Sequence, residues 1–253
     1  AGFVDQGSIP LAELFKSWDD PENRDLYGFE LSIKCFCPGL LEDVQVPTHL
    51  CDDLLQLFAP TNVSAPSLIV AAKGSRSFLH VDSSFWPFWI GMAHGRKHLR
   101  VITLEDISKH LGPELLKSGG LTLNADLFDE DAILPEGMEH VTVHDVVMLP
   151  GDVLHCPIGC GHAALNLDTP TVLIAANYIT ANLAPRMSAV YQALRAVLPE
   201  ANTQATWASH RTLVRVTDEA KANSPQLFGG SDICGDLRSS SWPSLVPYLA
   251  SYG

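Results

Sequence analysis

The residues of this sequence that are able to bind a metal gather in two short stretches. His80 and Asp82 are two residues apart, and on a β-strand the side chains at i and i+2 point to the same face. His162 ends the segment 150–162, whose Gly and Pro residues predict a tight turn that aims the side chain into a barrel mouth. Two imidazoles and one carboxylate on one face of a metal leave other positions open, which is typical of non-haem Fe(II) working with oxygen.

The elements that must position these residues change in character along the chain. Residues 11–18 and 50–58 predict helices, whereas from Pro66 to Tyr178 short β-rich runs bounded by Gly, Pro and Asp predict a sandwich or barrel. A helix over 105–117 and an acidic loop at 128–131 interrupt this block, as an insertion between two barrel halves. After Pro185 an amphipathic helix suits packing or dimerisation. The predicted strands are 68–72, 88–92, 99–103, 141–148, 153–156 and 172–178.

Composition predicts a packed, acidic protein. The 253 residues include 16 basic and 29 acidic side chains, a net charge of −13, which disfavours binding to a phosphate backbone. Hydrophobic residues make up 46%, so a sizeable core is expected, but no apolar run is long enough to span a bilayer. The six Cys are too sparse for a disulfide scaffold and favour a reducing compartment. We therefore expect a soluble intracellular protein, cytoplasmic or nuclear.

The order and spacing of these motifs resemble the Jumonji-C (JmjC) family of iron and 2-oxoglutarate oxygenases, most strongly over residues 60–180. Family members have an HxD motif, a Gly-x-Lys strand, a Pro-Gly-Asp turn with a Pro before the second metal His, and an Asn on the last core strand. The matching residues here are His80 and Asp82, Gly95 and Lys97, Pro150 to Asp152, Pro157 with His162, Asn166 and Asn177.

The resemblance implies a mainly β fold with flanking helices, a double-stranded β-helix of the cupin or jelly-roll type. It divides the chain into an N-terminal segment at 1–60, a catalytic core at 61–180 and a helical region at 181–253. His80, Asp82 and His162 are expected to bind Fe(II), and Lys97 the distal carboxylate of 2-oxoglutarate. Ser77 falls where a hydroxyl often contacts the same carboxylate, and Asn177 falls at a polar position of the cosubstrate pocket.

The implied reaction consumes O2 and 2-oxoglutarate, releases succinate and CO2, and hydroxylates a protein or peptide side chain. Asp82, rather than a Glu, favours hydroxylation over demethylation. The same chemistry on a small metabolite or a modified RNA base stays open, as does a metal-dependent cupin enzyme without an oxo acid. A catalytically inactive cupin-like binding module is a further alternative.

Some residues also allow readings away from this site. His155, Cys156, Cys160 and His162 allow a zinc cluster. The aromatic run 85–89 either lines a substrate channel or belongs to the core, and core is the better prediction. The C-terminal helices predict a homodimer interface.

Overall fold

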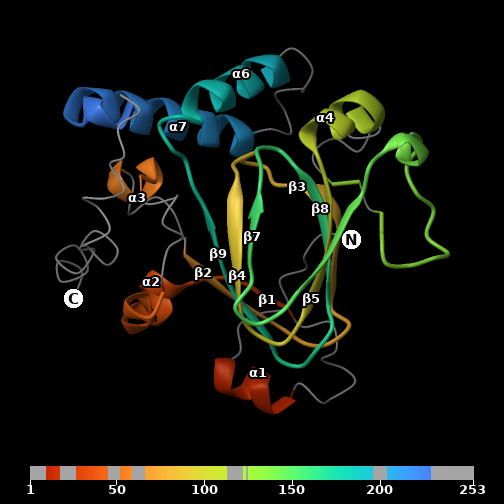
Figure 1. Cartoon of the computed structure of the whole chain (residues 1–253). Coiled ribbons are helices and arrows are strands. Elements are labelled where there is room, and N and C mark those ends of the chain that lie inside the picture. The colour runs from red at the N-terminus through yellow and green to blue at the C-terminus, as the bar shows by residue number, and fades with distance from the viewer. Residues whose placement is uncertain are drawn as a thin grey trace.

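The core of the molecule is a pair of facing β-sheets (Figure 1). A computed structural model describes residues 10–17, 27–44, 52–58, 66–112, 122–123, 125–195 and 204–228. β1 (Tyr27–Ser32) is an edge strand of one sheet. The other strands of the two sheets are β2 (Ser67–Ala71), β3 (Arg76–Val81), β4 (Phe88–His94), β5 (Lys97–Ile102), β6 (His144–Met148), β7 (Val153–Cys156), β8 (Gly161–Asn166) and β9 (Thr171–Asn177).

The strand order defines the fold. One sheet runs β1-β2-β9-β4-β7 and the other β3-β8-β5-β6, with every pair antiparallel. Successive strands from β2 to β9 therefore alternate between the sheets, except at the step from β5 to β6. This arrangement is a double-stranded β-helix, the cupin type of jelly roll, with β1 added at one edge. The predicted fold class is confirmed.

Alternating side chains of both sheets fill the space between them. Ile69, Phe88, Leu99, Met148 and Leu173 belong to one buried cluster there. Because side chains on a strand alternate between its two faces, the register of each strand decides which polar residues share this interior. The site is built from residues on these inward positions.

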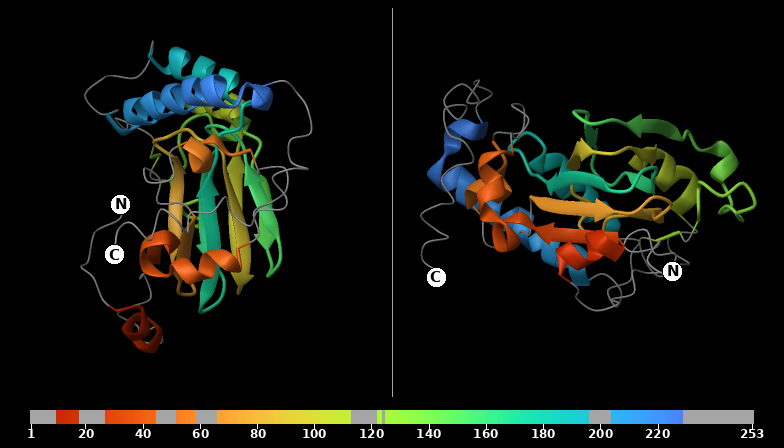
Figure 2. Two further views of the ribbon diagram at one scale, coloured as in Figure 1. Left: turned by 90° about the vertical axis from the view of Figure 1, so that its left-hand side faces the viewer. Right: turned by 90° about the horizontal axis from the view of Figure 1, so that it is seen from below.

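Helices cover the sandwich on three sides (Figure 2). The first pair, α2 (Ile33–Phe36) and η2 (Pro38–Glu42), packs on the outer face of the five-stranded sheet. The segment with α4 (Leu104–Asp106), η4 (Ile107–Leu111) and η5 (Met138–His140) covers the outer face of the other sheet. The helices at one end are α3 (Leu54–Phe58), α6 (Ala184–Arg195) and α7 (Gln204–Asn223). The remaining helices are α1 (Leu11–Ser17) and η7 (Pro225–Phe228).

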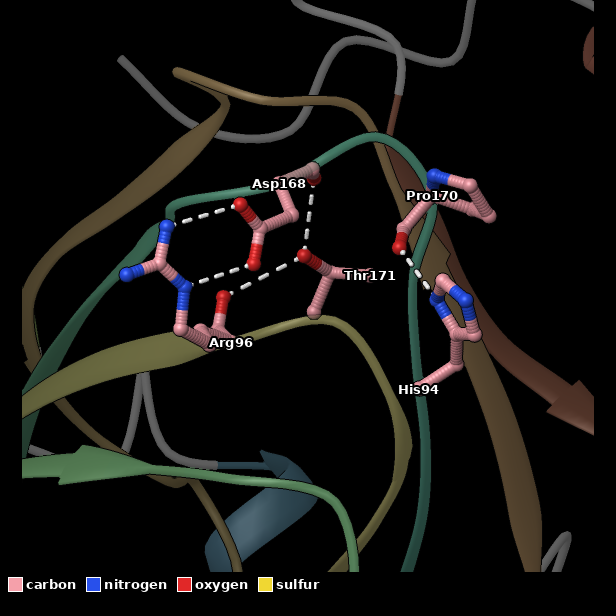
Figure 3. A network of polar contacts seen from close by, with 5 residues as sticks. All are labelled: His94, Arg96, Asp168, Pro170 and Thr171. Carbon is pink, nitrogen blue, oxygen red and sulfur yellow. Dashed lines mark hydrogen bonds and ion pairs between the residues drawn. The ribbon is translucent and has the colours of Figure 1, made fainter.

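We call the end under α6 and α7 the helix-capped end, formed by loops 82–87 and 157–160. At the opposite end, loops 95–96 and 167–170 are held together by a polar network (Figure 3). The Arg96 guanidinium donates two hydrogen bonds to Asp168, and Thr171 Oγ1 donates to Asp168 O at 2.9 Å. His94 Nδ1 lies 3.1 Å from Pro170 O. These contacts fasten β4 and β5 to the turn that joins β8 to β9.

Most predicted elements appear near their expected bounds. The helix expected over 11–18 is α1, and the insertion between barrel halves lies between β5 and β6. Part of the helix predicted at 50–58 and part of that at 105–117 fall outside the described residues. The strand predicted over 141–148 was wrong at its start, because β6 begins at His144 while Val141 and Val143 pack against the cover of the four-stranded sheet.

The C-terminal helix α6 packs within the chain, since its buried Met187 and Tyr191 meet α7 and the helix-capped end. The predicted homodimer and the division at residues 60 and 180 stay predictions. In the described residues, no helix combines the length and the apolar character that a membrane span requires.

Candidate metal centre

A β-bulge places His80 on the inner face of the sandwich. Ser77 pairs with Ala164 and His80 with His162, and the register between β3 and β8 shifts between the two pairs. Without that shift, positions 77 and 80, three apart, would point to opposite faces. Leu79 and Val81 instead pack outward with Ile102 and Ile107. The bulge therefore brings both Ser77 and His80 to the inward side.

Two imidazoles and one carboxylate converge at this point. His80 Nε2 lies 3.6 Å from Asp82 Oδ1, and His162 Nε2 lies 3.9 Å from the same oxygen. In the described residues, His80, Asp82 and His162 are the group whose ligand atoms all lie within 4.8 Å of one another. Two atoms that are each about 2.1 Å from one ion can be at most about 4.2 Å apart. Both measured distances to Asp82 therefore suit a shared cation.

The ring of His80 is oriented for coordination through Nε2. Its Nδ1 lies 2.7 Å from Phe78 O, a backbone carbonyl at the bulge. Because a carbonyl oxygen only accepts hydrogen bonds, Nδ1 carries the proton and Nε2 keeps its lone pair towards Asp82. Burial, and then the neighbouring His162, lower the pKa of His80 to about 4. The imidazole is therefore neutral near pH 7, as a metal ligand must be.

His162 is enclosed more tightly than its partners. Its side chain is 11% exposed, against 20% for His80 and 34% for Asp82. The ring lies 4.2 Å from that of His80 and 4.9 Å from that of Phe88, measured between centroids. Burial lowers the pKa of His162, but interactions with Cys160 and then Asp82 raise it by more, so the net shift is upward. Asp82 is therefore the most accessible of the three to solvent.

Lys97 lies inside the sandwich, further along the same sheet. It pairs with Asn166 across β8, while Val101 pairs with His162, so the two positions are four residues or about 13 Å apart along the strand. The side chain is 2% exposed, and its Nζ donates to Asn166 Oδ1 at 3.2 Å. Asn166 Nδ2 in turn donates to Ser75 O at 3.0 Å. A buried ammonium is thereby held in a fixed polar setting.

The other two predicted pocket residues also share the interior by register. Ser77 pairs with Ala164, which belongs to the inner core, and Asn177 pairs with Phe88 at the end of β9. Residues directly opposite in an antiparallel pair point to the same face. Ser77 and Asn177 are partly buried. Five of the six residues proposed from the sequence therefore lie on the facing inner sides of the two sheets, and Asp82 lies just beyond the end of β3.

Two readings of the sequence need correction. His162 does not lie in the turn that was predicted for it, because the turn ends at Cys160 and His162 is the second residue of β8. The alternative zinc cluster does not form, since His155 contacts the hydroxyl of Tyr178 while His162 lies at the inner site. The prediction that the aromatic run belongs to the core is confirmed, as Phe85, Trp86, Phe88 and Trp89 are buried.

Sequence reasoning missed two polar groups. It did not identify Asn166 as the partner of Lys97, although Asn166 belongs to the matched motif. It also missed a buried cluster of Lys34, Asp53 and Gln56, in which Lys34 Nζ donates to Gln56 Oε1 at 3.0 Å. Lys34 lies in α2, Gln56 in α3 and Asp53 directly before α3. No recognisable motif links them, so nothing in the local sequence indicates their contact.

No protein-family model matches this chain, and no curated protein matches it. Among solved structures, the Drosophila melanogaster CENP-C cupin domain matches with 11% identity and a TM-score of 0.29, covering 46% of this chain and 63% of that one. A structure of D. melanogaster CENP-C bound to CAL1 matches with 9% identity and a TM-score of 0.29, over 46% of this chain and 62% of that one. The match thus spans about three fifths of each of those chains. At such scores the likeness carries no inference about function, and the fold is assigned from strand order.

Proposed function

We propose that this protein is an Fe(II)- and 2-oxoglutarate-dependent oxygenase of the JmjC type that hydroxylates a protein or peptide side chain. The reaction joins O2, 2-oxoglutarate and a C–H group to give succinate, CO2 and a C–OH group. The proposal rests on one observation above all, the convergence of His80, Asp82 and His162 inside a double-stranded β-helix. Two imidazoles with one carboxylate form the donor set that suits non-haem Fe(II).

The donor set fits such an ion in detail. Phe78 O fixes the proton of His80 on Nδ1 and leaves Nε2 as a ligand. Asp82 supplies an anionic oxygen, which offsets part of the charge of a divalent ion. When bound, the iron and its oxo acid supply the oxidising chemistry, and the chain holds them in a partly enclosed site. His80, Asp82 and His162 occupy one side of this site.

Lys97 is the proposed partner of the distal carboxylate of 2-oxoglutarate. An ammonium that is 2% exposed forms a strong charge-assisted hydrogen bond with a carboxylate, because little water competes with it. Asn166 holds Lys97 on the inner face, and Ser75 holds Asn166. Ser77 and Asn177 supply further polar groups on that face. The net charge of −13 favours a protein or peptide over RNA as the substrate.

The proposal is tested by an anaerobic titration of the full chain with Fe(II) and 2-oxoglutarate. We expect a weak visible charge-transfer band that requires both components. Lys97→Ala should raise the 2-oxoglutarate concentration at half-saturation by about tenfold or more, in line with the loss of a charged hydrogen bond. Lys109→Ala changes an exposed lysine on η4 and serves as the matched control. The absence of any band in folded, Fe(II)-loaded protein would refute the oxygenase assignment.

One observation favours a second candidate, a cupin-like binding module without catalysis. The hydrogen-bond network of Lys97, Asn166 and Ser75 also has a purely structural explanation. A buried ammonium requires hydrogen-bond acceptors even when no ligand is present. In that case 2-oxoglutarate does not bind, and Lys97→Ala lowers stability without altering any Fe(II) spectrum. The same titration, followed by a urea unfolding curve of each variant, separates the two candidates.

A further inference from the structure

The side chain of Tyr191 joins the C-terminal helices to the loop that follows Asp82. Its hydroxyl donates to Ser84 O, across 107 positions of sequence. Its ring is 1% exposed and packs in one cluster with Trp86, Ile158 and Leu213. Burial raises the pKa of Tyr191, so the hydroxyl keeps its proton and remains a donor. The contact therefore fixes a backbone carbonyl two residues beyond a proposed metal ligand.

The loop that Tyr191 contacts has an unusual backbone. Phe85 has φ +55°, in the left-handed region, where a residue with a bulky side chain is strained. Phe85 N donates to Asp82 O at 2.8 Å, which closes the turn directly after the ligand. Surrounding structure must hold such a conformation in place. The described contacts that support it are the hydrogen bond from Tyr191 to Ser84 O, the backbone bonds of Phe85 and the packing of the Phe85 ring.

The same loop is tied to the strand that carries His162. Gly159 N donates to Phe85 O at 3.1 Å, just before β8 begins at Gly161. Gly159 has φ +61°, and a Cβ on it would lie 3.1 Å from the Phe85 ring, so the two turns approach closely. The loops before His162 and after Asp82 are therefore joined to each other, and Tyr191 of α6 joins them to the C-terminal helices.

Asp82 depends on this support more than the two histidines do. His80 and His162 are paired with each other in the β3–β8 ladder, which fixes their positions. Asp82 follows the last residue of β3 and lies outside that ladder. Its side chain is also the most exposed of the three, at 34%. The place of its carboxylate is therefore set by the loop and by what holds the loop.

We infer that Tyr191 is a positioning residue of the metal site, through which the helix pair α6 and α7 holds Asp82 in reach of His80 and His162. The inference rests on the proposed metal site. It assigns the C-terminal helices a role in metal affinity, beyond covering one end of the sandwich. Tyr191 is not among the three residues proposed to bind the metal, and it acts through the carbonyl of Ser84.

The test compares two buried tyrosines in the full chain, with Co(II) as the probe. Tyr191→Phe keeps the ring and removes the donor to Ser84. Tyr178→Phe is the matched control, because Tyr178 is also buried and its hydroxyl contacts His155, away from the loop. We expect Tyr191→Phe to weaken Co(II) binding by about tenfold and to change the ligand-field spectrum of the bound ion. Tyr178→Phe should leave both unchanged.

The outcomes are distinguishable. Wild-type affinity and spectrum in folded Tyr191→Phe would overturn the inference while the metal site stands. A wild-type chain that binds no Co(II) would remove the proposed function and the inference together. If Tyr191→Phe does not fold, hydrogen exchange of the wild type tests the coupling between the loop and α6 instead. Joint protection of residues 82–86 and 184–195 on adding Co(II) supports the coupling, and unchanged exchange at 184–195 overturns it.

Discussion

Two polar clusters of the described residues differ in how their groups are used, the inner site and the cluster of Lys34, Asp53 and Gln56. At the inner site, His80, Asp82 and His162 aim lone pairs at a common point. Beneath α2 and α3, Asp53 Oδ1 accepts hydrogen bonds from Leu55 N at 3.0 Å and Ile179 N at 2.9 Å. The first group is arranged to receive a ligand, whereas the second binds the N-terminal segment to β9 and the strand end beyond it.

The difference shows that buried charge alone does not identify a functional site. Burial raises the pKa of Asp53 to about 7 and lowers the pKa of Lys34 to about 8, so both groups are strongly perturbed. Yet Asp53 is occupied by backbone donors, and Lys34 donates to Gln56. A perturbed group marks a candidate site when its free lone pair converges with other ligand atoms, as that of His80 does.

The largest effect is expected from removing a ligand of the inner site. Asp82→Ala should weaken Co(II) binding by about a hundredfold or more, since even partners outside the ligand shell contribute about tenfold to a hundredfold. Isothermal titration calorimetry measures the affinity. Asp145→Ala removes an exposed carboxylate that is paired with Arg100 on the same barrel, and it should bind Co(II) as the wild type does. Equal affinity in the two variants would exclude Asp82 as a ligand.

A large loss of stability, without loss of metal binding, is expected at the second cluster. Asp53→Ala leaves the buried N–H groups of Leu55 and Ile179 without their acceptor, which should cost roughly 2–4 kcal/mol of unfolding free energy. Urea unfolding at pH 5 measures this loss. A parallel Co(II) titration should give the wild-type affinity. A marked drop in Co(II) affinity would show that the two clusters are coupled and would end the contrast drawn between them.

The second cluster also predicts how stability depends on pH. The pKa of Asp53 is raised from 3.8 to about 7, so the folded state binds its proton more tightly, and stability falls as pH rises across that interval. The pKa of Lys34 is lowered from 10.5 to about 8, so stability rises again as pH increases between these values. Each slope is at most about 1.4 kcal/mol per pH unit.

Asp53→Asn sharpens this prediction, because its amide oxygen still accepts hydrogen bonds but does not titrate. Urea unfolding between pH 4 and 9 should show a minimum in the free energy of unfolding near pH 7 to 8 in the wild type. In Asp53→Asn, the free energy of unfolding should fall less steeply between pH 4 and 7. Parallel curves for the two proteins would mean that Asp53 has an ordinary pKa in the folded state.

The smallest effect is expected at the opposite end of the sandwich. Arg96→Ala removes the exposed pair with Asp168, in a region where screening by water leaves little net energy (Figure 3). We expect little change in the urea midpoint and none in Co(II) affinity. A clear fall in affinity would show that the loops near Lys97 communicate with the metal site.

Much of the fold was predictable because strand patterns are local. The runs at 88–92 and 153–156 are short, mainly apolar and bounded by Gly, Pro or Asp, and they correspond to β4 and β7. The error at His162 has an equally local origin. Pro157 and Gly159 do form a turn, but nothing in the sequence indicated that it ends one residue before a strand begins at Gly161.

The sequence by itself determined the β-rich core, the spacing of His80 and Asp82, and the residue types available at the site. Only the tertiary structure decided the bulge that turns His80 inward, its pairing with His162, and the contacts of Lys97 with Asn166 and Tyr191 with Ser84. The reason is physical. Side-chain periodicity depends on neighbours a few residues apart, whereas register and burial depend on packing between segments far apart in the sequence. Lys97 and Asn166 are 69 positions apart, and Tyr191 and Ser84 are 107 positions apart.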